Sequence, residues 1–167
     1  MSTEAEPSAA DDPRAALLDG WLALTGQAAP APGLVRLPML SGSMSPSLPP
    51  GCTLVIDARE PERFSPGEVI VLARDGHLVA HRVLWRVRDR VLEMGDANAR
   101  GAWRPAAEVV GLVVGAQAAD GSLLPVPTSR RLALRGLWRH LRGRWLPLPV
   151  DDIPSLPDRE SPHRDQP

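Results

Sequence analysis

Residues 68–87 read EVIVLARDGHLVAHRVLWRV, two apolar runs separated by the dipeptide Asp75-Gly76. An Asp-Gly pair between runs rich in Val, Leu and Ile is a strong signal for a tight β-hairpin turn. Successive side chains of a strand point to opposite faces of a sheet. The second strand of the hairpin therefore places four side chains on one face, those of His77, Val79, His81 and Val83.

Short apolar runs of the same kind continue on both sides of this hairpin, separated by Pro-, Gly- and Asp-containing turns. They predict strands at Leu34–Leu40, Thr53–Asp57, Glu68–Ala73, Leu78–Val87, Val91–Met94 and Val109–Ala116. Residues 122–127 are a candidate for one more strand. The fold class that this pattern favours is a mostly β domain over residues 34–127.

The segments that flank this domain have a different character. Residues 1–33 are expected to contain a disordered arm, a short amphipathic helix over Pro13–Gln27 and a linker. Residues 128–146 combine regularly spaced arginines with leucines and tryptophans, which predicts a basic amphipathic helix. Residues 147–167 are rich in proline and are expected to be a disordered tail.

Composition excludes several classes of protein. The formal net charge of −1 argues against a general nucleic-acid binder, so no nucleic-acid partner is expected. The single cysteine, Cys52, excludes an intramolecular disulfide and argues against a cysteine-based metal site. We see neither a secretory signal nor a run of about 18 apolar residues that could span a membrane. The sequence therefore predicts a cytoplasmic protein with no metal.

Residues 41–46 read SGSMSP, a turn of small residues that offers Ser43 as a nucleophile. A serine hydroxyl needs a base to react near neutral pH. All 19 of the Lys and Arg residues are arginine, which stays protonated and cannot serve as that base. A side-chain base that titrates near neutrality must therefore be one of four histidines, His77, His81, His140 and His163.

Five segments in order resemble the conserved boxes of type I signal peptidases and their relatives in the S24/S26 peptidase group. They are SGSMSPSLPPG at 41–51, FSPGEVIV at 64–71, AHRV at 80–83, GDAN at 95–98 and EVVG at 108–111. The bacterial and LexA-type members use a lysine base. The archaeal and endoplasmic-reticulum type carries histidine there, which is the branch that AHRV resembles.

The resemblance implies a LexA- or signal-peptidase-like fold of coiled antiparallel sheets and a serine endopeptidase activity. The substrate implied is a precursor or leader peptide, cut after small residues without a cofactor. Ser43 would be the nucleophile and His81 the general base, with Asp96 orienting the imidazolium. The Ser43 N–H and the Ser41 hydroxyl would form the oxyanion hole. Two further residues, Met44 and Pro46, would contact the substrate.

Each of these residues also has a plainer interpretation. Asp96 could make only an Asx turn, Ser41 could be an ordinary turn hydroxyl, and Met44 could be a packing residue. His77 sits at the hairpin turn, where a solvated side chain is the better interpretation. Cys52 stands where relatives have aspartate, and a small apolar residue at a strand start explains it.

Three functional alternatives follow from the departures from the family pattern. The missing membrane anchor favours processing of a dedicated leader or precursor peptide over general secretory cleavage. A degenerate peptidase fold could instead bind a peptide without cutting it. A LexA-like self-cleaving regulator would need a lysine base and an N-terminal DNA-binding domain, which this chain does not provide.

The basic segment 130–145 could either lie on an anionic membrane with Trp138 and Trp145 at the interface or present a solvated arginine face.

Overall fold

The predicted hairpin is confirmed in the computed structural model, which describes residues 16, 20, 31, 33–61 and 63–145. Strand β3 (Val69–Arg74) pairs with β4 (His77–Val87), and Arg74 lies opposite His77. Asp75 and Gly76 both have positive φ, 49° and 75°. A type I′ hairpin turn requires this conformation at both central residues, which is why Asp-Gly suits the position.

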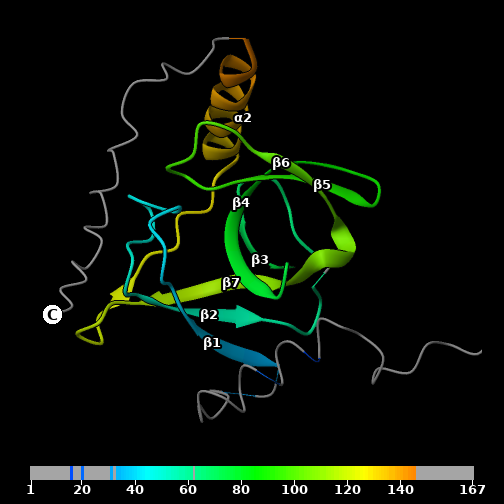
Figure 1. Ribbon diagram of the computed structural model, residues 1–167. Helices are drawn as coiled ribbons and strands as arrows, with labels where there is room; N and C mark the ends of the chain where they lie inside the picture. The colour runs from blue at the N-terminus through cyan, green and yellow to red at the C-terminus, as the bar shows by residue number, and fades with distance from the viewer. Residues whose placement is uncertain (1–15, 17–19, 21–30, 32, 62, 146–167) are drawn as a thin grey trace, which may run out of the picture.

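The mostly β fold class is also confirmed. One antiparallel sheet contains the strands in the order β1-β2-β7-β3-β4-β5-β6, with β8 also paired to β7. The sheet curls strongly, and β4 bends along its length (Figure 1). The remaining strands are β1 (Leu34–Pro38), β2 (Thr53–Asp57), β5 (Arg90–Met94), β6 (Ala102–Pro105), β7 (Val109–Gln117) and β8 (Leu123–Leu124).

The central strand β3 is buried on both faces, which explains its uninterrupted apolar sequence. One face carries Val69 and Val71 into an apolar cluster with β1, β2 and the turn after β1. The other face carries Ile70 and Leu72 into a second cluster with β4, β5 and β7. Cys52 belongs to the first cluster, and burial raises the pKa of its thiol, so it stays protonated and packs as an apolar residue.

Helix α2 (Arg130–Trp145) stands at the end of the sheet remote from β1 and β2 (Figure 1). It packs on β4 at Gly136, where a Cβ atom would lie 2.5 Å from Cδ2 of Leu84. Leu137 joins the apolar cluster formed by Leu84, Leu92 and Met94. Among the described residues, no helix combines the length and the hydropathy needed to cross a bilayer.

The structure adds two elements inside the β domain, and it describes only part of the predicted flanks. Strand β6 and the short 3₁₀ helix Ala106–Glu108 were not predicted, and β6 exists through its pairing with β5. Of the helix predicted over Pro13–Gln27, the structure describes only Ala16 and Gly20, both helical. The remaining part of that helix and the segments predicted to be disordered at 1–13 and 147–167 lie outside the described residues.

Candidate active site

The turn that follows β1 presents Ser43 at the protein surface while anchoring the residue beside it. Met44 and Leu48 are completely buried in the first apolar cluster. Two backbone hydrogen bonds close the turn, from Ser45 N to Gly42 O at 3.0 Å and from Leu48 N to Met44 O at 3.0 Å. Ser43 itself remains partly exposed. Burial of its neighbour therefore fixes the candidate nucleophile in place without covering it.

The backbone of Ser43 docks against the end of β5, next to the strand that carries His81. The Ala97 N–H donates to the Ser43 carbonyl at 2.9 Å. Gly95 lies so close that a Cβ atom there would come within 2.5 Å of the same oxygen. Arg82 pairs with Met94 in the β4–β5 ladder, so Gly95 occupies the next position, opposite His81. The structure thus brings the Ser43 turn and the His81 backbone to the same place.

His81 is buried, and its Nδ1 atom shares a hydrogen bond with the carboxylate of Glu93 on β5. Glu93 is also buried and pairs with Val83, so it lies diagonally across from His81 on the same face. The Arg104 Nε atom lies 3.8 Å from the second carboxylate oxygen, Oε1. A carboxylate in this position can fix the tautomer and orientation of an imidazole and stabilise its protonated form. Sequence analysis missed Glu93.

The prediction that Asp96 orients the His81 imidazole is wrong in this structure. Both oxygens of Asp96 accept hydrogen bonds from Arg82, from Nε at 2.7 Å and from Nη2 at 2.6 Å. Arg82 is completely buried, and its Nη1 also donates to the carbonyls of Gly67 and Pro127, each at 2.6 Å. Neighbours on β4 point to opposite faces, so the acid that reaches Arg82 is turned away from His81.

This arrangement predicts a structural role for Asp96. Replacing Asp96 with asparagine leaves the buried Arg82 guanidinium without its counterion, so we expect the free energy of unfolding to fall by about 3–5 kcal/mol. Asp75→Asn is the matched control, because Asp75 is exposed and its pair with Arg74 contributes little. Urea unfolding measures both. Equal stability of the two variants would contradict the assignment.

The hydroxyls of Ser41 and Ser43 lie within hydrogen-bonding distance, with Oγ atoms 3.2 Å apart. Ser41, the predicted second oxyanion donor, thus has its hydroxyl beside that of the predicted nucleophile. No hydrogen bond between the Ser43 hydroxyl and His81 occurs among the described residues. Catalytic hydrogen bonds are often loose in a free enzyme and tighten when substrate binds.

An apolar groove of about 940 Å³ has Ser41 among its lining residues. One wall is the segment Leu37–Ser41, which continues β1, and a second is the first part of β4, His77–Ala80. Ala16 and Gly20 also line the groove. β1 pairs only with β2, and residues 77–80 of β4 pair only with β3 in the described sheet. Both walls therefore carry strand edges with unpaired backbone groups, the arrangement to which an extended peptide can add.

The two predicted substrate contacts do not line this groove. Met44 is completely buried, so the structure gives it a packing role in place of the predicted contact. Pro46 is exposed at the turn and follows a cis Ser45–Pro46 bond, outside the groove. His77, assigned to the hairpin turn, is exposed and lies in the groove wall. The sequence lacks any signal for the groove, because its lining comes from several segments that lie far apart in the chain.

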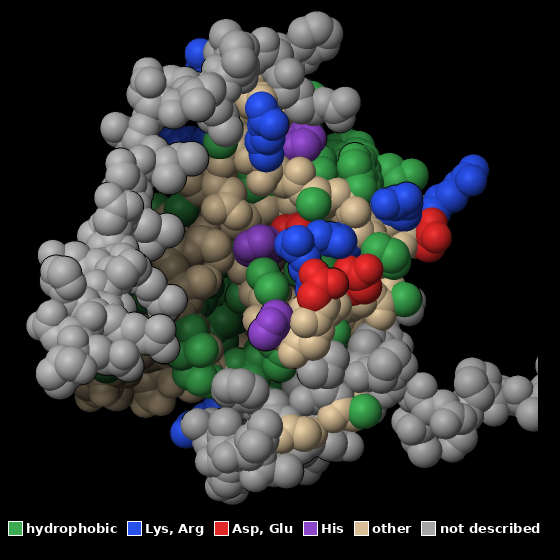
Figure 2. All heavy atoms as spheres, viewed as in Figure 1, with side chains coloured by type: hydrophobic (Ala, Val, Ile, Leu, Met, Phe, Trp, Pro, Cys, Tyr) green, Lys and Arg blue, Asp and Glu red, His purple; other side chains and the backbone are tan. Residues whose placement is uncertain are grey.

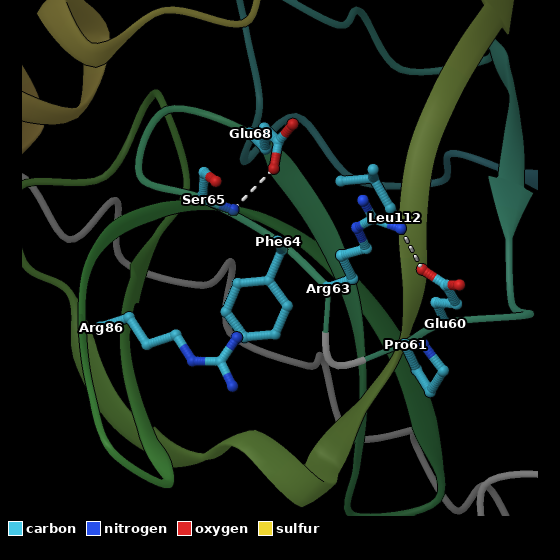
Figure 3. A pocket seen from close by; sticks show the side chains of 8 residues that line it. All are labelled: Glu60, Pro61, Arg63, Phe64, Ser65, Glu68, Arg86 and Leu112. Carbon is cyan, nitrogen blue, oxygen red and sulfur yellow. Dashed lines mark hydrogen bonds and ion pairs between the residues drawn. The ribbon is translucent and has the colours of Figure 1, made fainter.

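A second cavity, of about 890 Å³, contains none of the candidate residues. Its charged side chains have partners of their own: Arg63 pairs with Glu60, and Glu68 accepts a hydrogen bond from Ser65 N (Figure 3). The Arg86 guanidinium lies 4.5 Å from the centre of the Phe64 ring. In the view of Figure 2, by contrast, histidine, arginine and acidic side chains gather near the middle of one face of the molecule.

No group of three or more potential metal ligands occurs among the residues that the structure describes. The side chains of the candidate site offer a hydroxyl, an imidazole and a buried carboxylate. No protein-family model matches the sequence, and no curated protein is significantly similar to it.

Proposed function

We propose that this protein is a serine endopeptidase of the signal-peptidase-like type, which cleaves a leader or precursor peptide after a small residue. The observation that carries the proposal is the placement of His81. Its imidazole is held by the buried Glu93, and its strand position lies opposite Gly95, against which the Ser43 turn is docked. A hydroxyl, an imidazole and a carboxylate bound to that imidazole are the groups that acyl-transfer enzymes combine, which supports the proposal.

In the reaction we propose, His81 accepts the proton of Ser43 as the hydroxyl oxygen attacks the scissile carbonyl. Glu93 stabilises the imidazolium that forms. The Ser43 N–H donates no backbone hydrogen bond to another described residue. This N–H and the Ser41 hydroxyl would stabilise the oxyanion of the tetrahedral intermediate. The imidazolium then protonates the leaving amine. Attack of water on the acyl group at Ser43, with His81 again as base, completes hydrolysis.

The groove supports an extended peptide as the substrate. Its walls offer unpaired backbone groups on both sides, so a peptide lying between them would gain strand-like hydrogen bonds. Buried Leu54 and Val71 line the groove and favour apolar side chains at alternate positions of that peptide. Cleavage after a small residue such as alanine is the preference that the resemblance to signal peptidases implies.

A library of unstructured peptides, each with alanine or another small residue at a central position, tests this function. Mass spectrometry after incubation with the wild-type protein should show cleavage on the carboxyl side of small residues. Inhibition by a fluorophosphonate would identify a serine mechanism. Cleavage that persists at full rate after treatment with the fluorophosphonate would count against the proposal.

Glu93 should be needed for turnover more than for peptide binding. We expect Glu93→Gln to lower kcat by roughly 10³- to 10⁴-fold with little change in KM, since the imidazole loses its orienting carboxylate. Glu93→Asp should recover part of the loss. Asp96→Asn is the comparison, assayed at a temperature where it remains folded, and should retain kcat within about tenfold. A larger loss in Asp96→Asn than in Glu93→Gln would restore Asp96 to the role predicted from sequence.

One observation favours a second function, a peptide-binding module without catalysis. The Ser43 hydroxyl is near that of Ser41, and no hydrogen bond to His81 is formed among the described residues. In that case the wild-type protein and Ser43→Ala would bind the same peptides equally well, and neither protein would cleave them. Isothermal titration of a peptide that binds, followed by mass spectrometry of the same sample, separates the two functions.

A further inference from the structure

Helix α2 has an exposed apolar stripe that the fold does not use. The stripe consists of Leu134, Trp138 and Leu141, spaced i, i+4 and i+7 along one side of the helix. These side chains are 60%, 62% and 44% exposed. A tryptophan and two leucines left in water on one helix face mark a surface that binds something apolar.

The charges of α2 all have one sign. The helix contains no aspartate or glutamate, although the whole chain has a net charge of only −1. Arg131, Arg135 and Arg142 are exposed and follow one flank of the apolar stripe. The Arg142 guanidinium lies 5.9 Å from the centre of the Trp138 ring. Positive charge is therefore concentrated beside the exposed apolar side chains.

The opposite side of α2 is fully occupied by the domain. Ala133 and His140 are buried there, and Gly136 touches Leu84 of β4. Three hydrogen bonds attach this side to the loop after β5: from Arg139 Nη1 to Asp96 O at 2.6 Å, from Gly101 N to His140 Nδ1 at 3.0 Å, and from Arg100 Nε to Gly143 O at 2.9 Å. The stripe and its arginine flank thus point away from the β domain, to which the opposite side of α2 is attached.

We propose that α2 lies flat on an anionic lipid bilayer, with the apolar stripe entering the headgroup region and the three flanking arginines on lipid phosphates. An anionic bilayer supplies both apolar depth and negative charge along the whole length of the helix, about 24 Å for 16 residues. A protein partner would favour a helix with charges of both signs to fix the register. The absence of any acidic side chain from α2 fits a phosphate surface better.

The contacts of α2 connect this surface with the candidate active site. Arg139 holds the carbonyl of Asp96, and the next residue, Ala97, donates its N–H to the Ser43 carbonyl. The side of α2 that faces the domain is therefore linked to the Ser43 turn through the backbone of Asp96 and Ala97. Lipid binding itself requires no catalysis, so the test below does not depend on the proposed peptidase function.

Sedimentation with sucrose-loaded vesicles tests the proposal on the full chain. We expect the wild-type protein to sediment with vesicles of phosphatidylcholine and phosphatidylglycerol and to remain in the supernatant with phosphatidylcholine alone. Added salt should weaken the binding. The triple variant Arg131→Gln/Arg135→Gln/Arg142→Gln should bind about 100-fold more weakly, since each cationic side chain near the surface contributes roughly fivefold.

A second triple variant, Leu134→Ser/Trp138→Ala/Leu141→Ser, should lose binding to a similar degree. Leu123→Ser is the matched control, because Leu123 is 86% exposed and lies outside α2. Circular dichroism confirms that each variant is folded. The proposal is overturned if the wild type does not sediment with the anionic vesicles, or if the stripe variant binds as well as the wild type. A dimer that fails to sediment, and that the stripe substitutions convert to a monomer, would assign the stripe to a second copy of the chain.

Discussion

Replacing Ser43 with alanine is expected to reduce kcat for peptide cleavage by at least about 10⁴-fold and to leave peptide binding unchanged. Alanine removes the oxygen that would form the acyl intermediate. The turn itself should persist, because it is anchored by the burial of Met44 and Leu48 and by the Ala97 N–H on the Ser43 carbonyl. Initial rates on a fluorogenic peptide that contains the preferred cleavage site measure the effect.

Ser47→Ala is the matched control for that experiment. Ser47 lies in the same turn, four residues along the chain, and has no assigned part in the chemistry. Its variant should cleave peptides at a rate within about threefold of wild type. Retention of more than a tenth of wild-type kcat by Ser43→Ala would exclude Ser43 as the nucleophile.

The second large effect is expected at His81. His81→Ala should lower kcat by roughly 10⁴- to 10⁶-fold, because the chain would lose the imidazole that we propose as the base for Ser43. The substitution also leaves a small cavity next to Glu93. Imidazole added to the solution can enter such a cavity, so we expect it to restore a measurable part of the activity of this variant.

His77→Ala serves as the control for this substitution. His77 is on the same strand but is exposed at the hairpin, in the wall of the groove. We expect its removal to change KM for peptides more than kcat, and imidazole should have no effect on it. An equal loss of kcat in the two variants would mean that neither histidine acts as the specific base.

The position of His81 could be predicted from the sequence because it depends only on local signals. Asp75-Gly76 fixes the hairpin turn, and the turn fixes the register of β3 on β4. Alternation along β4 then places His81 on the face of Val79 and Val83. The turn around Ser43 was equally local, since small residues, prolines and a buried methionine specify it.

The carboxylate that holds His81 could not be predicted in the same way. The β4–β5 ladder contains a bulge between Val83 and Trp85, which changes which residues of the two strands face each other. An irregularity of this kind leaves no clear sequence pattern. Asp96 was the attractive choice because it lies in the GDAN segment, but in the structure it neutralises the buried Arg82 while Glu93 occupies the face of His81.

Strand β6 shows the same limit for the fold. Its sequence, Ala-Trp-Arg-Pro, contains no β-branched residue and ends in a proline. The strand forms because β5 offers a free edge with Leu92 opposite Trp103. A proline is tolerated at Pro105 because β6 is an edge strand and needs no hydrogen bond on its outer side. Tertiary pairing, and not local preference, decides this element.

The most direct test of the account is covalent labelling with a fluorophosphonate, followed by mass spectrometry of the proteolytic peptides. If Ser43 is activated by His81, the wild-type protein should carry a single adduct on Ser43, and His81→Ala should label at least about 100-fold more slowly under the same conditions. An intact wild-type protein that takes up no label, or one that is labelled at Ser43 equally fast with and without His81, would contradict it.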